Sequence, residues 1–336
     1  MTDRQNLDRD HFVSVIAVLM DDAQLVEAFV GDVALVLKSR YENYEIILID
    51  NDSEEDTPAV MRGLLSREDC IRYVKLSSRY SMEAALSAGL EIAIGDVVVT
   101  MEPECDPAAL LPTFVDKTIA TGGVVYGIRV NHDAAMAVSY RLGKKIFHVL
   151  CKVLFEFSPP RSAGFYMGLS RAAVNAIVQI KGKAKFLRVF GRRIGYRTDS
   201  VSYAIVPRRR LRRRSLARSV DYGLAVIFTN STRPLRLISL LGVAAAAMNA
   251  LWFAYLLAAA LVRRTAPGPV ALLALQIAAS GVFLFVIIVF LCEHYIRSVE
   301  NVTDGPTYYI DHELTSSVMV AGEEQRRNVY EASGRP

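Results

Sequence analysis

Two different hydrophobic patterns divide the chain. Over the first 130 residues, short apolar runs rich in β-branched residues alternate with longer runs of helical spacing. Near the carboxyl end lie two long apolar stretches, Leu235–Val262 and Val270–Cys292. Each exceeds the ~20 residues that a helix needs to span a bilayer. The pattern predicts an α/β domain at residues 1–230, transmembrane helices at 235–262 and 270–292, and a cytoplasmic tail at 293–336.

Strand–helix alternation in the first part predicts a mostly parallel, Rossmann-like sheet with helices on both faces, because strands linked by helices pair in parallel. We expect strands at Phe12–Leu19, Tyr44–Asp50, Ile71–Leu76, Asp96–Met101 and Gly123–Val130, and helices at Leu25–Leu37, Thr57–Leu65 and Met82–Ala93.

Acidic residues follow three of the predicted strands. They are Asp21 and Asp22, then Asp50 and Asp52, then Glu102, Glu104 and Asp106. Ligands of parallel sheets bind at the carboxyl ends of the strands. These carboxylates therefore indicate a nucleotide-binding edge, although Glu102 and Glu104 could also be ordinary solvated loop acids.

Positive charge gathers just before the first long apolar stretch. Seven arginines and no acidic residue lie between Arg208 and Arg218. By the positive-inside rule this flank is cytoplasmic. The polar N-terminus has no apolar core of a signal peptide, so we expect the large domain on the same side of an inner (cytoplasmic) membrane. A nucleic-acid site is the alternative for such a stripe, but membrane lipids or a lipid phosphate are favoured beside a span.

Amphipathic segments and cysteines complete the pattern. Residues 139–157 have apolar positions at helical spacing and a cationic opposite side, which favours an interfacial helix over one that packs on the sheet. Residues 215–228 are a second, weaker candidate. The four cysteines have neither CxxC nor Cys/His spacing, so we expect no metal cluster and no disulfide framework.

Four segments carry a resemblance to a known family. They are EIILIDNDSEEDT (Glu45–Thr57), EAALSAGLEIAIGDVVV (Glu83–Val99), VVYGIRV (Val124–Val130) and STRPLRLISLLG (Ser231–Gly242). From about Val13 to Asp311 the chain resembles the family-2 glycosyltransferases that move sugars onto polyprenyl phosphates, the dolichol-phosphate-mannose-synthase-like and bactoprenol glucosyltransferase group. The resemblance implies a GT-A fold, a nucleotide-sugar donor, Mg²⁺ or Mn²⁺, a polyprenyl-phosphate acceptor and a homo-oligomer, commonly a tetramer.

The resemblance also implies roles for individual residues. Glu102 and Glu104 would bind the metal, and Asp106 would act as a general base or support the site. The nucleotide sugar would contact Asp21, Asp50, Asp52, Arg79 and Arg129. An arginine cluster beside the membrane suits a phosphate, which arginine binds in a bidentate manner. The acceptor phosphate is therefore assigned to Arg208, Arg209, Arg210, Arg212, Arg213 and Arg214.

The chain departs from the family pattern at its chemical positions. Glu102-Pro103-Glu104 replaces Asp-x-Asp, and Phe165 and Met167 stand where an aspartate and an arginine are usual. Arginines fill the loop Pro207–Ser215. Three hypotheses follow: an active transferase with an altered site, a catalytically degenerate paralogue that serves as a structural or regulatory partner, and a metal-independent transferase in which arginines do the electrostatic work of the metal.

Overall fold

The computed structural model describes most of the α/β part of the chain and one long helix. The described residues are 8–21, 23–53, 57–130, 163–180, 187, 195–208, 268–302 and 308–316, with scattered residues between 241 and 258. The chain forms two compact units, one of residues 1–145, 157–214 and 304–336, and one of residues 146–156 and 215–303. The predicted amphipathic helices at 139–157 and 215–228 lie outside the described residues.

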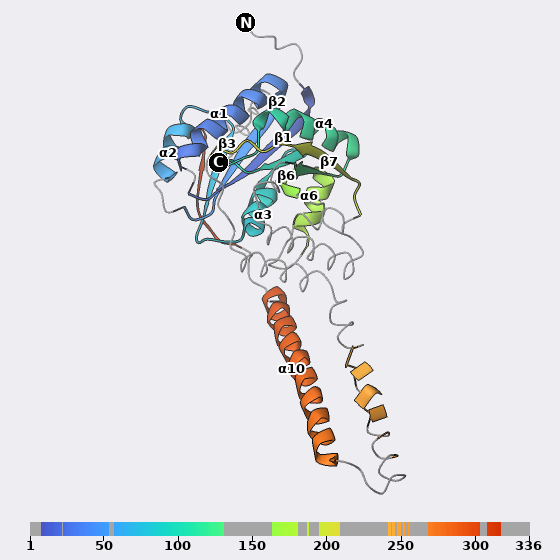
Figure 1. Ribbon diagram of the computed structural model, residues 1–336. Helices are drawn as coiled ribbons and strands as arrows, with labels where there is room; N and C mark the ends of the chain where they lie inside the picture. The colour runs from blue at the N-terminus through green and yellow to red at the C-terminus, as the bar shows by residue number, and fades with distance from the viewer. Residues whose placement is uncertain are drawn as a thin grey trace, which may run out of the picture. The chain divides into compact units, whose positions relative to one another are not determined.

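The first unit is built on an eight-stranded sheet with the order β7-β5-β6-β4-β1-β2-β3-β8 (Figure 1). Four of the seven strand pairs are parallel, whereas β6 and β8 run antiparallel to their neighbours. The mostly parallel α/β sheet is thus confirmed. The strands are β1 (Asp8–Leu19), β2 (Tyr41–Asp50), β3 (Ile71–Leu76), β4 (Val97–Met101), β5 (Val124–Arg129), β6 (Ala163–Ser170), β7 (Thr198–Tyr203) and β8 (Ile310–Thr315).

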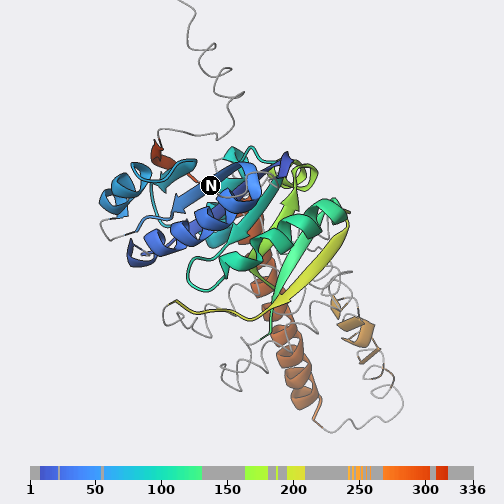
Figure 2. The same ribbon diagram turned by 90° about the horizontal axis from the view of Figure 1, so that it is seen from above.

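Helices cover both faces of this sheet (Figures 1 and 2). Residues of α1, α2 and α4 share one buried apolar cluster with the strands, and residues of α3 and α6 share a second. The sheet is therefore the middle layer of three. The bounds are α1 (Ala23–Arg40), α2 (Thr57–Leu65), α3 (Met82–Ile92), η2 (Ala108–Leu110), α4 (Leu111–Thr121) and α6 (Arg171–Val178).

Strand β1 shows why the predicted strands are nearly continuous runs of apolar residues. Val13 and Val15 belong to the first apolar cluster, whereas Ile16 and Val18 belong to the second, and all four are buried. A strand covered on both faces needs apolar side chains at successive positions rather than at every second one. All five predicted strands and three predicted helices are present, with ends that differ by a few residues at most.

The carboxyl ends of β1, β2 and β4 meet at one edge of the sheet. Leu19 of β1 is in register with Asp50 of β2, and Ala17 of β1 is in register with Met101 of β4. The loops that follow these strands therefore begin side by side. This register brings the acidic residues after the three strands to the same edge.

Strand β8 lies in the segment 293–336 that the sequence analysis assigned to a cytoplasmic tail. It pairs with β3 at the edge of the sheet, and the backbone N–H of Ser316 donates to the carbonyl of Ile71 (2.9 Å) while Ile71 N–H donates to Ser316 Oγ (3.0 Å). Arg72 Nε and Glu313 Oε1 form an ion pair at 3.1 Å. Residues from the far end of the chain thus complete the sheet of the first unit.

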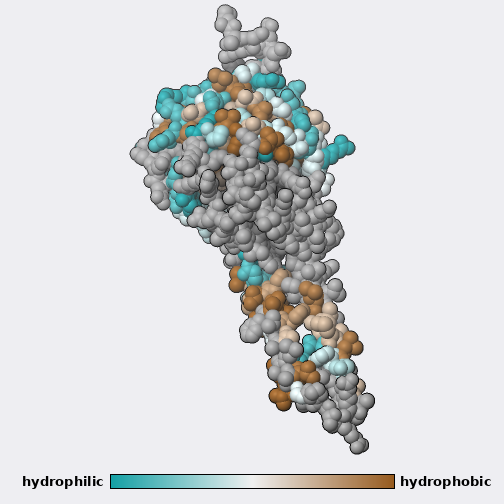
Figure 3. Space-filling view, in the orientation of Figure 1, coloured by the Kyte–Doolittle hydropathy of each residue, from teal (hydrophilic) through white to brown (hydrophobic). Residues whose placement is uncertain are grey.

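The second unit contains α10 (Pro269–Val302), a helix of 34 residues that is about 50 Å long. Its portion Ala279–Ser298 is long and apolar enough to cross a membrane, and no other helix among the described residues meets this test. Figure 3 shows hydrophobic residues along this part of the chain. The predicted span at 270–292 therefore falls within a helix, whereas most of the span predicted at 235–262 lies outside the described residues.

Two polar residues within the apolar stretches contact each other. Ser280 Oγ of α10 donates a hydrogen bond to Asn249 Oδ1 (3.1 Å), and Asn249 Nδ2 donates to the carbonyl of Ala245 (3.0 Å). In an apolar environment such groups are costly unless they are paired. Asn249 and Ser280, which are polar residues within the two apolar stretches, thus satisfy each other by a hydrogen bond.

We expect β8 to be required for the stability of the sheet. A chain that ends at residue 307 should unfold roughly 5 °C lower or more than a chain that ends at residue 317, because it leaves the edge of β3 unpaired. Thermal unfolding of the two detergent-solubilised chains measures the difference. Equal unfolding temperatures would show that β8 contributes nothing to the fold.

Candidate functional site

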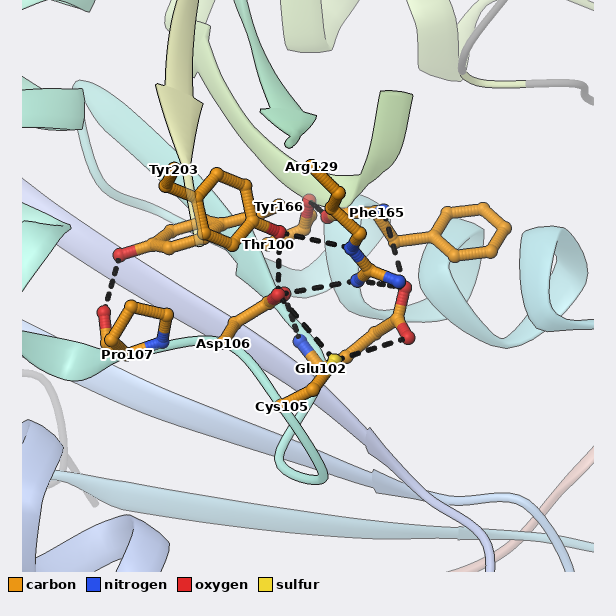
Figure 4. Close-up of polar contacts among 9 residues, drawn as sticks. All are labelled: Thr100, Glu102, Cys105, Asp106, Pro107, Arg129, Phe165, Tyr166 and Tyr203. Carbon is orange, nitrogen blue, oxygen red and sulfur yellow. Dashed lines mark hydrogen bonds and ion pairs between the residues drawn. The ribbon is translucent and has the colours of Figure 1, made fainter. Parts of the chain in front are cut away.

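A buried carboxylate stands at the centre of the loop that follows β4 (Figure 4). Asp106 is 1% exposed and accepts four hydrogen bonds, of which the one from Cys105 Sγ is long (3.7 Å). Oδ1 accepts from Tyr203 Oη (2.6 Å) and Arg129 Nη2 (3.2 Å), and Oδ2 accepts from the backbone N–H of Glu102 (2.9 Å). Both carboxylate oxygens of Asp106 are therefore engaged by groups of the protein.

Arg129, the last residue of β5, joins Asp106 to Glu102 in one network. Its side chain is 11% exposed, and Nη2 lies 2.8 Å from Glu102 Oε1 and 3.2 Å from Asp106 Oδ1. Its Nε donates to Tyr203 Oη (3.1 Å), because Arg129 and Tyr203 are paired in register between the parallel strands β5 and β7. One guanidinium thus contacts two carboxylates and a tyrosine hydroxyl.

The neighbouring strand β6 leaves room for this guanidinium. A Cβ atom at Gly164 would lie 2.5 Å from Arg129 Nε, which is closer than Cβ atoms approach other heavy atoms. Phe165, the next residue, donates its backbone N–H to Glu102 Oε1 (3.2 Å). Any side chain larger than glycine at position 164 would therefore push Arg129 away from Glu102.

The electrostatics of the cluster follow from burial and from the short distances. The pKa of Asp106 is raised to about 6. Burial contributes most to this increase and the negative charge of Glu102 adds to it, whereas Arg129 and the hydrogen bonds from Tyr203 and the Glu102 backbone oppose it. Burial alone would lower the pKa of Arg129, but Glu102 and Asp106 raise it above its ordinary value. Arg129 consequently stays charged, and it is the cation that the two carboxylates share.

A second polar cluster lies at the ends of β1, β2 and β3. Asp50 is fully buried, and it accepts from the backbone N–H of Ser53 (2.9 Å) and from Tyr73 Oη (2.5 Å). Ser53 Oγ in turn accepts from the backbone N–H of Asp21 (3.1 Å). The Asp50 carboxylate therefore holds the turn after β2 against the turn after β1.

Two other aspartates of this cluster, in the turns after β1 and β2, are only partly buried. Asp21 and Asp52 have φ angles of 59° and 56°, in the left-handed region that aspartate tolerates better than most residues. Arg79 Nη2 donates to Asp21 Oδ2 (2.6 Å). The side chain of Asn51 holds the backbone of Tyr80 through two hydrogen bonds, of 2.8 and 2.9 Å. The loops after β1, β2 and β3 thus form one connected surface.

Arg208, the first residue of the arginine run, is attached to the loop after β4. Its backbone N–H donates to the carbonyl of Glu104 (2.8 Å), its guanidinium donates to Asp32 Oδ2 of α1 (2.6 Å), and it lies over the ring of Phe29. In this arrangement its charge is paired with Asp32. The other five arginines assigned to the acceptor phosphate (Arg209, Arg210, Arg212, Arg213 and Arg214) lie outside the described residues.

The carboxylates of the loop after β4 do not form a prepared metal site. Metal ligands must offer free lone pairs, but Glu102 Oε1 accepts from Arg129 and Phe165, and both oxygens of Asp106 are occupied. Glu104 lies half-buried in the same loop. Among the described residues, no group of three or more His, Cys, Asp or Glu side chains is placed to hold a metal ion. Of the Glu102 and Asp106 oxygens, only Glu102 Oε2 is without a close donor, since Cys105 Sγ lies 3.9 Å from it, and one such oxygen is fewer ligands than a divalent cation needs.

The two clusters also contain residues that the sequence analysis did not single out: Tyr73, Gly164 and Tyr203. The unusual residues Phe165 and Met167 are buried in the second apolar cluster, so their side chains add neither charge nor a metal ligand to the site. The alternating run TDSVSY at Thr198–Tyr203 was a signal for a strand. Its pairing with β5, which brings Tyr203 to Arg129, could not be read from that run.

Comparison with known proteins assigns the α/β part to a family. Residues 18–178 match the family model described as glycosyl transferase family 2. An uncharacterized glycosyltransferase of Synechocystis sp. is 25% identical over 232 residues, which are 68% of this chain and 73% of that protein. The undecaprenyl-phosphate 4-deoxy-4-formamido-L-arabinose transferase of Yersinia pestis is 23% identical over 335 residues, 94% of this chain and 95% of that protein. Residues 18–178 therefore form a glycosyltransferase family 2 domain, and the chain is a glycosyltransferase.

Solved structures with similar folds were found as well. Glucosyl-3-phosphoglycerate synthase from Mycobacterium tuberculosis, in complex with Mn²⁺, UDP-glucose and phosphoglyceric acid, has a TM-score of 0.49 and 15% sequence identity to this chain. The likeness covers 67% of this chain and 80% of that protein.

Replacing Asp106 should change how stability depends on pH. The raised pKa means that the folded protein holds the Asp106 proton more tightly than the unfolded chain does. Protonated Asp106 therefore contributes to the free energy of unfolding, and this contribution is complete below about pH 3.8 and is lost as pH rises through about 6. Asp106→Asn removes it. Thermal unfolding between pH 4 and 7 should show the wild-type unfolding temperature falling relative to that of the variant as pH rises.

The exposed Asp116 provides the control, because Asp116→Asn removes a carboxylate that is 63% exposed. Its unfolding temperature should follow that of the wild type across the same pH range. Parallel curves for Asp106→Asn and the wild type would contradict a raised pKa at Asp106.

Proposed function

We propose that this glycosyltransferase moves a sugar from a nucleoside-diphosphate sugar to a polyprenyl phosphate at the cytoplasmic face of a membrane. The observation that carries the proposal is the match over 94% of the chain to a transferase named for undecaprenyl phosphate. The apolar helix segment Ala279–Ser298 supports it, because a polyprenyl chain resides in the bilayer.

The nucleoside of the donor is assigned to the cluster at the ends of β1, β2 and β3. Asp50 is buried and bound by Tyr73 and Ser53, so its role there is to hold the turn that carries Asp52. Asp52 and Asp21 can accept hydrogen bonds from ribose hydroxyls or a base edge, and Arg79 can pair with the donor diphosphate. This division of roles assigns the contacts with the donor to Asp21, Asp52 and Arg79, which are partly exposed.

The reaction itself requires orientation of a phosphate more than removal of a proton. A phosphate monoester is largely ionised at neutral pH, so it can attack the sugar carbon without a general base. Asp106 is buried with both oxygens engaged, and it is therefore assigned to positioning Arg129. The arginine run that begins at Arg208 is proposed to hold the acceptor phosphate next to the membrane.

A transfer assay tests the proposal. The purified full chain in detergent is given undecaprenyl phosphate and a panel of UDP- and GDP-sugars, and the glycolipid product is detected by mass spectrometry. We expect product from at least one donor and none with undecaprenol, which lacks the phosphate. The absence of product from folded protein with every donor would favour a catalytically inactive partner instead.

A pair of matched arginine variants tests the assignment of the nucleotide. Arg79→Gln removes the cation beside Asp21 and should raise the KM for the donor about tenfold, since a charge-assisted hydrogen bond to a diphosphate would be lost. Arg67→Gln removes an arginine that pairs with Glu27 and should leave the KM unchanged. Equal effects of the two variants would exclude Arg79 from the donor site.

A further inference from the structure

The space between the carboxylates of Glu102 and Asp106 is filled by a side chain of the protein. Arg129 Nη2 lies within 3.2 Å of one oxygen of Glu102 and one of Asp106, so the guanidinium sits between the two carboxylates (Figure 4). A divalent cation at Glu102 Oε1 would be only a few ångströms from this positive charge. Repulsion at such a distance is strong in a buried site, where little water screens it.

Three features of the backbone hold the guanidinium in place. The register between β5 and β7 sets Tyr203 beside Arg129, Gly164 of β6 leaves space that a Cβ atom would take, and the N–H of Phe165 fixes the Glu102 oxygen that Arg129 contacts. These contacts come from three strands. The guanidinium is therefore built into the sheet and does not depend on a flexible surface arrangement.

We propose that Arg129 is the resident cation of the Glu102–Asp106 pair and that it excludes divalent metal from these carboxylates in the nucleotide-free protein. The charges support this assignment, because one arginine neutralises one of the two negative charges and its donors occupy an oxygen of each carboxylate. A metal gains access to Glu102 only when the guanidinium leaves it for another anion. This anion is the diphosphate of the donor, an assignment that rests on the proposed function. The exclusion of metal from the free protein does not rest on it.

Direct metal binding tests the proposal without any transfer reaction. The full chain in detergent, freed of metal and nucleotide, is titrated with Mn²⁺, and free Mn²⁺ is followed by electron paramagnetic resonance. We expect the wild type to show no more binding than Glu102→Gln. Arg129→Gln should bind Mn²⁺ at least tenfold more tightly than the wild type, and the double variant Arg129→Gln/Glu102→Gln should lose this gain.

Further variants separate the charge of Arg129 from its effect on folding. Arg129→Lys keeps the positive charge and should exclude Mn²⁺ as the wild type does, and thermal unfolding shows which variants are folded. Glu27→Gln, an exposed carboxylate remote in the chain, should leave Mn²⁺ binding unchanged. If Arg129→Gln does not fold, the wild type and Glu102→Gln still decide the question.

Two results would overturn the proposal. One is tight Mn²⁺ binding by the nucleotide-free wild type that Glu102→Gln abolishes, which would show that the metal displaces Arg129 unaided. The other is a folded Arg129→Gln variant with the Mn²⁺ affinity of the wild type, which would show that the guanidinium does not control access. Neither result depends on whether the chain transfers a sugar, so the two proposals can fail separately.

Discussion

The ion pair of Arg129 with Glu102 and Asp106 is the interaction on which one half of the molecule depends. A fully buried carboxylate such as Asp106 is tolerated only when it is paired and hydrogen-bonded. Its partners come from the loop after β4, from β5 and from β7, and Glu102 adds the backbone of β6. Residues from strands that are far apart in sequence are thereby joined at one end of the sheet.

The other half of the sheet uses the same principle with a different partner. Asp50 is also buried, but a tyrosine hydroxyl and a backbone N–H satisfy it instead of an arginine. Tyr73, which donates that hydroxyl, lies on β3, whose outer edge is paired with β8. The loop that carries Asp52 is consequently connected, through Asp50 and Tyr73, to a strand from the carboxyl end of the chain.

The two buried carboxylates change how the acidic residues of this family member are interpreted. Strand-end acids suggest direct contacts with a ligand, and several of the predicted roles assume such contacts. Asp50 and Asp106 instead have every oxygen bound by the protein, whereas Asp21 and Asp52 are only partly buried in the turns. The buried acids hold the site together, whereas the more exposed acids can contact a substrate. Which acids are buried depends on the residues that pack around them.

Much of the fold was predictable from local pattern. Strands β1 to β5 and helices α1 to α3 were predicted because apolar periodicity is a property of neighbouring residues, and the acids after β1, β2 and β4 were placed at one edge because parallel strands share their direction. Strands β6, β7 and β8 were not predicted. β6 and β8 run antiparallel to their neighbours, and β8 lies far along the chain from its partner β3.

The sequence by itself therefore determined the class of fold, the apolar helix near the carboxyl end and the edge of the sheet where the acids gather. Only the tertiary structure decided which acid pairs with which partner. Tyr203 reaches Asp106 across 97 positions, and Phe165 reaches Glu102 across 63. Hydrogen bonds of this kind depend on the register between distant strands, and a difference of one residue in register would turn each side chain to the opposite face of the sheet.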